Sequence, residues 1–191
     1  IITATTDENG IAAFSNLIIN SADQGYIITF NANHSGVPNT QSASFTVTSA
    51  APSYISVTTQ PQNSVAGQAI GGPPTAAAFD QFGNRVTGVE ITAEPNQHTA
   101  SFSGTTTLIT NENGEAVFDD LIQTHSAPNY TLFFTASGVS TGTSNSFSVG
   151  NAAPHTISII TQPSETVAGA AISGPPVVAV LDEFDNPVQG E

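Results

Sequence analysis

Three acidic side chains near the end of the chain are the first candidates for chemistry. Asp182, Glu183 and Asp185 lie within four residues of one another, and clustered carboxylate oxygens are the ligands that calcium prefers. Asp is equally typical of turns, where its side chain accepts hydrogen bonds from nearby main-chain N–H groups. A similar segment earlier in the chain keeps the first acid, as Asp80, but has Gln and Gly at the other two places. We therefore predict a solvated turn, with a calcium site at these three residues as the alternative and no other cofactor.

Two further acidic pairs are candidates for a catalytic acid and base. They are Glu90 with Glu94 and Asp119 with Asp120. Acid–base catalysis requires both groups to face a substrate in a cleft. On exposed strands and turns, the same charges keep a protein soluble and protect strand edges from pairing with other chains. We predict this second role.

The histidines and hydroxyl side chains give no catalytic pattern. None of the four histidines (His34, His98, His125 and His155) recurs at an equivalent place in the chain, whereas a zinc site built by repetition would recur. The sequence contains neither a nucleophile elbow nor a His-Glu-x-x-His motif, which are signatures of hydrolases and metalloproteases. We predict that the chain is not an enzyme.

The composition excludes several classes of partner. The chain has 15 acidic residues, a single basic one (Arg85) and a net charge of −14, and it lacks cysteine, methionine and tryptophan. Binding to nucleic acid or to anionic lipid depends on clusters of Lys and Arg, so we predict neither. No apolar run approaches the roughly 18–20 residues of a membrane span, and we predict no membrane insertion. Without cysteine there are no disulfides or thiolate sites.

The chain also repeats itself. Four segments between residues 55 and 84 recur 102 residues later in the chain. The pairs are 55–61 with 157–163, 65–67 with 167–169, 72–74 with 174–176, and 80–84 with 182–186. Three segments between residues 7 and 47 also recur. The separation is 104 residues for 7–10 with 111–114 and for 26–30 with 130–134, and after a two-residue insertion it is 102 residues for 45–47 with 147–149. Such self-similarity is the signature of a repeat protein.

These spacings predict three units. Residues 1–50 are the back half of one repeat, 51–151 a complete repeat, and 152–191 the front half of a third. The junctions read Ser-Ala-Ala-Pro at 49–52 and Asn-Ala-Ala-Pro at 151–154, which favours tight linkers. The chain begins with Ile1 and has no basic leader, so we expect a window cut from a longer protein. The predicted partners are neighbouring repeats of that protein.

The complete repeat has the pattern of an antiparallel β-sandwich of about 100 residues. The predicted strands cover 54–59, 75–80, 89–93, 105–110, 116–122 and 146–149, with a further strand from Tyr130 in which alternate residues are apolar. Asn113-Gly114 lies between two of these strands, and Asn-Gly is typical of a hairpin turn. No stretch has a sustained helical period. The predicted fold is all-β, with tandem immunoglobulin-like sandwiches.

The repeated motifs resemble those of bacterial immunoglobulin-like domains. The residues that carry the resemblance are Thr6-Asp7-Glu8-Asn9-Gly10-Ile11-Ala12 and Asp182-Glu183-Phe184-Asp185-Asn186-Pro187-Val188. Such domains are stacked in the stalks of invasin-like and intimin-like adhesins and in large gliding-motility and adhesion proteins of Bacteroidetes-type bacteria. The resemblance implies an extracellular, surface-attached protein without catalytic residues or a fixed ligand. Tyr26 and Tyr130 match the tyrosine corner of such domains, whose hydroxyl bonds nearby main chain.

Three functional hypotheses follow from these observations. The first is a structural stalk that projects a binding tip or carries traction, with an unidentified host, substratum or glycan as its target. The second is a glycan-binding repeat, which the absence of tryptophan disfavours, as does our expectation that the few tyrosines are buried. The third is a filament in which the half-repeats of neighbouring molecules complete one another. Neither half contains an equivalent of residues 90–104, so we prefer the stalk to the filament.

Overall fold

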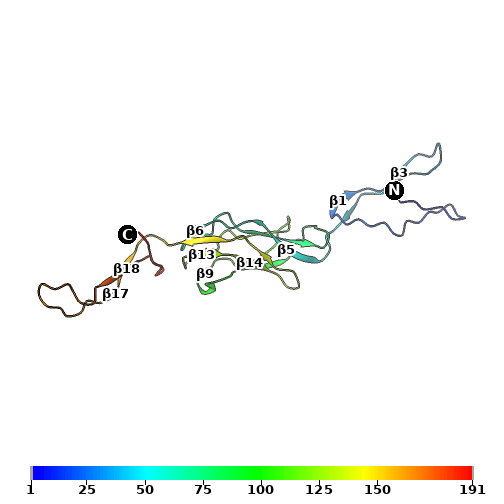
Figure 1. Cartoon of the computed structure of the whole chain (residues 1–191). Helices are drawn as coiled ribbons and strands as arrows, with labels where there is room; N and C mark the ends of the chain where they lie inside the picture. Colours follow the sequence, from blue (N-terminus) through cyan, green and yellow to red (C-terminus); the bar gives the residue numbers. More distant parts are fainter. Residues whose placement is uncertain (1, 191) are drawn as a thin grey trace.

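The chain is long and narrow. The computed structural model describes residues 2–190, and Figure 1 shows three parts in line, with the N-terminal strands at one end and the C-terminal strands at the other. We call residues 2–50 the N-terminal part, 51–151 the middle unit and 152–190 the C-terminal part. Most of the strands lie in the middle unit (Figure 1).

The regular secondary structure of residues 2–190 consists of β-strands and one short 3-10 helix, η1 (Thr99–Ser101). The strands of the N-terminal part are β1 (Asp23–Tyr26), β2 (Thr29–Phe30), β3 (Thr40–Gln41) and β4 (Phe45–Val47). Those of the middle unit are β5 (Pro52–Thr59), β6 (Ser64–Val65), β7 (Thr75–Asp80), β8 (Glu90–Pro95), β9 (Phe102–Ser103), β10 (Thr107–Ile109), β11 (Glu115–Val117), β12 (Ile122–Gln123), β13 (Ala127–Tyr130), β14 (Leu132–Thr135), β15 (Gly142–Thr143) and β16 (Phe147–Gly150). The C-terminal part has β17 (Thr156–Thr161) and β18 (Val177–Leu181). The prediction of an all-β fold is confirmed.

The middle unit contains several small sheets around one core. Strands β10, β8, β14 and β15 form an antiparallel sheet in that order, and β11, β7 and β5 form another. Strands β13 and β16 are antiparallel, whereas β16 pairs with β6 in parallel. This arrangement is consistent with a β-sandwich.

Alternating side chains of these strands fill the core. Tyr130, Leu132 and Phe134 are fully buried, as predicted from their period of two, because successive side chains of a strand point to opposite faces. They pack in one cluster with Ile91 of β8 and Ile55 of β5. The core therefore depends on strands far apart in the sequence.

Equivalent segments of the three parts have equivalent strand pairing. In the middle unit Tyr130 lies opposite Phe147, and in the N-terminal part Tyr26 lies opposite Phe45. Strand β17 pairs with β18 in the register in which β5 pairs with β7. The sequence repeat is thus also a repeat of strand register.

The terminal parts expose side chains that the middle unit buries. Ile157 and Ile172 are 71% and 54% exposed, whereas their counterparts Ile55 and Ile70 are 5% and 3% exposed. The N-terminal part likewise leaves apolar side chains uncovered, and five of them line a hollow: Leu17, Ile19, Ile28, Phe45 and Val47.

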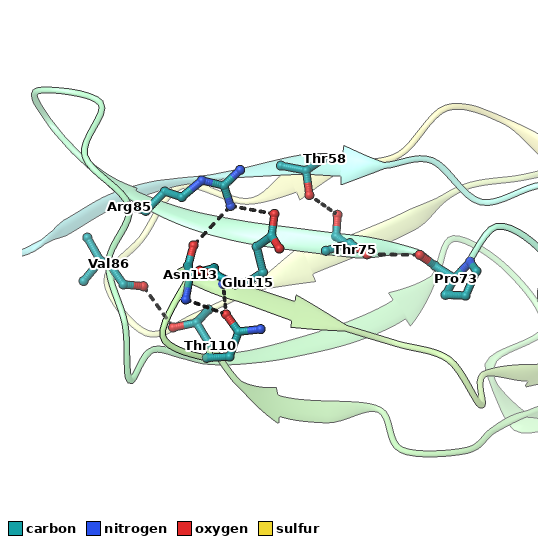
Figure 2. Close-up of polar contacts among 9 residues, drawn as sticks. Thr58, Pro73, Thr75, Arg85, Val86, Thr110, Asn113 and Glu115 are labelled. Atoms are coloured by element: carbon teal, nitrogen blue, oxygen red, sulfur yellow. Dashed lines mark hydrogen bonds and ion pairs between the residues drawn. The ribbon is translucent and has the colours of Figure 1, made fainter.

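The hairpin prediction at Asn113-Gly114 is supported in detail. Oδ1 of Asn111 accepts from the N–H groups of Asn113 (2.9 Å) and Glu115 (3.1 Å). Gly114 has a φ of 69°, and a Cβ there would lie 2.8 Å from the Cβ of Arg85. Figure 2 shows Arg85 reaching across this turn to the carboxylate of Glu115 (2.7 Å) and the carbonyl of Asn113 (3.2 Å).

Two sequence expectations differ from the structure. The strand predicted over 116–122 is interrupted, because β11 ends at Val117 and β12 begins only at Ile122. Asp120 lies in the interruption and accepts from the N–H and hydroxyl of Thr105 (2.9 and 2.7 Å), and Asp is unfavourable in strands. Tyr54 was expected to be buried but is 38% exposed. Its ring stacks on that of Phe79, with centroids 5.2 Å apart.

No helix among residues 2–190 is long and apolar enough to cross a membrane.

Candidate functional site at the junctions between repeats

The turn at 182–186, directly after β18, binds the linker at 151–154 that joins the middle unit to β17. Oδ1 of Asp182 accepts from the N–H groups of Phe184 (2.9 Å) and Asn186 (2.8 Å), which closes the turn. Its other oxygen, Oδ2, accepts from the main-chain N–H of Ala152 (2.8 Å) and from Nδ2 of Asn186 (2.9 Å). One carboxylate therefore shapes its own turn and fixes the linker between two repeats.

Asn186 extends the contact to the middle unit. Its Nδ2 donates to the carbonyl of Thr124 (2.8 Å), and its Oδ1 accepts from the N–H of Ser126 (2.9 Å). The loop at 124–126 is itself anchored, because the buried hydroxyl of Tyr130 donates to the carbonyl of His125 (2.9 Å). The amide of Asn186 thus binds main chain that the middle unit already holds in place.

The first junction has the same geometry. Asp80 accepts from the N–H groups of Phe82 and Asn84 through Oδ1, and from Ala50 and the amide of Asn84 through Oδ2, at 2.8–2.9 Å. Asn84 also donates to the carbonyl of Asn20 (2.7 Å) and accepts from the N–H of Ala22 (2.8 Å). Each of the six hydrogen bonds at this junction therefore has a counterpart at the second. We call residues 80–84 and 182–186 the junction turns.

Both aspartates are held in the ionised form. Burial alone would raise the pKa of Asp80, but the Asn84 amide and the N–H groups of Ala50, Asn84 and Phe82 together lower it from 3.8 to about 2. The pKa of Asp182 is lowered in the same way: burial opposes the shift, and the Asn186 amide and the N–H groups of Ala152, Asn186 and Phe184 outweigh it. N–H donors that favour the charged form account for both shifts.

The three residues considered for calcium have different environments. We predicted a solvated turn, and for Asp182 this is wrong: the residue is only 1% exposed and lies buried in its turn. Its two oxygens accept the four N–H groups described above, whereas Glu183 and Asp185 are exposed. Among residues 2–190 no group of three His, Cys, Asp or Glu side chains converges as metal ligands do. A calcium site at these three residues stays the alternative to a turn without a metal.

The other candidate residues are dispersed. Glu90, Glu94 and Asp119 are exposed, as predicted. The ring of His98 stacks on that of His125, with centroids 3.6 Å apart and an interplanar angle of 9°. Sequence reasoning missed this pair, because a 27-residue separation with no recurrence gives no pattern.

No family model matches the chain, and no curated protein sequence matches it.

The linkers at 49–52 and 151–154 contain no acidic residue, and the sequence prediction missed the acids that bind them from elsewhere in the chain. Asp80 and Asp182 each follow their linker alanine by 30 residues. The available signal was an Asp followed four residues later by an Asn, present in both junction turns. The hairpin at 111–115 lacks that Asn, and it binds only within the middle unit.

Proposed function

We propose that the chain consists of immunoglobulin-like stalk repeats of a long extracellular bacterial adhesin or surface fibre. In this role the repeats project a binding tip from the cell or carry adhesive load. The observation that carries the proposal is that two successive junctions are built by the same six hydrogen bonds. A junction that is repeated in this way places each repeat on the last in a constant orientation.

The physics of linear arrays favours this role. In a stack of repeats each unit contacts only its neighbours, so length grows by duplication without a new core. The net charge of −14 opposes lateral association of such fibres and adhesion to anionic surfaces. The in-line arrangement in Figure 1 gives the most length per residue.

The filament alternative conflicts with the sheet order. Strand β8 lies between β10 and β14 in its sheet, and the terminal parts contain no counterpart of residues 90–104. A repeat assembled from two such halves would lack β8, and its two neighbours, β10 and β14, would each be left with an unpaired edge. We therefore rank complementation below the stalk.

Glycan binding has one observation in its favour. Tyr54 stacks on Phe79 at the surface, with an interplanar angle of 12°, and exposed aromatic faces are common sugar platforms. A glycan array that includes a Tyr54→Ala variant tests this second candidate. Binding that disappears in the variant would support it.

The stalk proposal is tested on the organism that makes the chain. Antibodies raised against the 191-residue chain should label the surface of intact cells in immunogold electron microscopy. Protease shaving should release peptides of this sequence from a species far heavier than 19.5 kDa. Labelling only after the cells are opened would contradict the proposal.

A further inference from the structure

The central aromatic residue of each junction turn has a different environment at the two junctions. Phe184 is half-buried and packs against the core of the middle unit. Phe82, its counterpart, is 50% exposed. The six junction hydrogen bonds are the same in both places, so they do not account for this difference.

Gly67 lies against the ring at the second junction. A Cβ on Gly67 would overlap Cζ and Cε2 of Phe184, so the ring lies where a side chain would otherwise project. The counterpart of this glycine in the C-terminal part is Gly169, and nothing lies within 4 Å of a Cβ built there. Residues 2–50 match only the back half of a repeat and contain no counterpart of Gly67, so Phe82 has no such glycine to pack against, and no ring lies against Gly169.

The turn that contains Gly67 is tied to its surroundings. Gly67 has a φ of 79°, and its N–H donates to the carbonyl of Gln123 (3.1 Å). The N–H of the preceding Ala66 donates to the carbonyl of Gly150 (2.8 Å), at the end of the last strand of the middle unit. Gly67 is therefore held beside both the linker and the loop that Asn186 binds. We call Gly67 and the main chain of 124–126 the glycine socket.

We propose that the glycine socket is a recognition surface for the Asp-x-Phe-x-Asn turn of the following repeat, and that this contact fixes the orientation of neighbouring repeats without a bound cation. The occupant is another repeat of the same protein. The inference rests on the proposed function for its biological purpose, although the contact itself stands on the geometry alone.

The two halves of the contact have different tasks. Asn186 binds the carbonyl of Thr124 and the N–H of Ser126, main-chain groups that almost any sequence presents. These bonds fix position without selecting a partner. The packing of Phe184 on Gly67 depends on both side chains, because any larger residue at the glycine excludes the ring. Selectivity for a repeat of this kind comes from that pair.

The chain provides its own matched controls for the test. It has no cysteine, so Thr135→Cys and Thr161→Cys, at exposed positions of β14 and β17, introduce two spin labels across the second junction. Double electron–electron resonance on the full chain should give one narrow distribution of distances between the two labels, unchanged by calcium or by a chelator. Phe184→Ala should abolish the narrow distribution. Phe82→Ala removes the same ring where it has no socket, and should leave the distribution as it was.

A second pair of variants tests the socket from the other side. Gly67→Ala should broaden the distribution, and Gly169→Ala should not, although both glycines have a positive φ (79° and 84°). Circular dichroism of each variant shows whether the middle unit remains folded. A distribution that stays narrow in a folded Phe184→Ala variant, or one that broadens when calcium is chelated from the unsubstituted chain, would overturn the proposal.

The outcomes separate this inference from the stalk proposal. A narrow distribution in a protein that is found only inside cells refutes the stalk and leaves the socket standing. A broad distribution in a protein that labels the cell surface refutes the socket and leaves the stalk standing.

Discussion

At the scale of single residues, Asp182 joins a turn to a linker through two oxygens with different partners. Oδ1 accepts only from its own turn, whereas Oδ2 accepts from Ala152 and from the side chain of Asn186. Because both donors to Oδ2 are N–H groups, an NH₂ group in its place would face two donors and accept from neither. The charge and the shape of this carboxylate are both needed.

We predict that Asp182→Asn frees the linker of the second junction. The substitution places a donor opposite Ala152 N–H, or else turns the oxygen away from Phe184. Loss of a hydrogen bond to a charged group should raise the hydrogen-exchange rate of the Ala152 amide about tenfold or more. Asp185→Asn is the control, since it removes one charge from an exposed position three residues away. Equal protection of the Ala152 amide in the two variants would contradict this assignment.

A second prediction concerns the tyrosine that anchors the loop at 124–126. Tyr130→Phe deletes the hydroxyl that donates to His125 and leaves the buried ring in place. We expect a loss of about 1 kcal/mol in the free energy of unfolding of the middle unit, measured in urea. Tyr54→Phe, at an exposed ring, should change stability by less than about 0.5 kcal/mol. A larger effect at Tyr54 than at Tyr130 would mean that the anchor is unimportant.

The sequence predicted these residues unequally. The hydroxyl bonds of Tyr26 and Tyr130 agree with the tyrosine-corner prediction, and each is made to a carbonyl five residues earlier. The role of Asp182 was missed because Ala152 lies 30 residues away, and turn chemistry alone explains an Asp at this place. Only the register of β17 on β18 brings the two together.

At the scale of elements, β8 is an inner strand of its four-stranded sheet and supplies a fully buried side chain, Ile91. A strand was predicted over 89–93, whereas its inner place in the sheet was not. That place depends on pairing with β14, about 40 residues later in the chain. Local patterns do not specify which strands become neighbours.

We predict that Ile91→Ala destabilises the middle unit by about 2–5 kcal/mol, because it leaves a cavity in a packed core. The matched control is Ile109→Ala in the neighbouring strand β10, where the side chain is 63% exposed. That change should cost less than about 0.5 kcal/mol. Chemical denaturation followed by tyrosine fluorescence measures both. Similar costs at the two positions would contradict the burial pattern.

At the scale of the whole molecule, the three parts are held in line by contacts that belong to the turns and linkers. The middle unit has its own core, so a junction can open while that core remains folded. The shape of the chain and the stability of its middle unit should therefore respond differently to a change that acts only on Asp80 and Asp182.

Acid is such a change. The pKa of Asp80 falls from 3.8 to about 2 in the folded chain, and that of Asp182 is also lowered. A group with a lowered pKa stabilises the folded form above its unfolded value, and this contribution is lost as the pH falls through the folded value. The first junction should therefore be intact from neutral pH to about pH 4 and open as the pH approaches 2. The second junction should also be intact at neutral pH and lose the contribution of Asp182 below pH 3.8.

Small-angle scattering of the full chain across this range measures the opening as a loss of the rod-like profile, and the spin-label distances report the second junction alone. The Asp182→Asn variant should show a broad spin-label distribution already at neutral pH, with little further change in acid. A junction that stays closed at pH 2 in the unsubstituted chain would mean that the aromatic contact, and not the carboxylate, holds it.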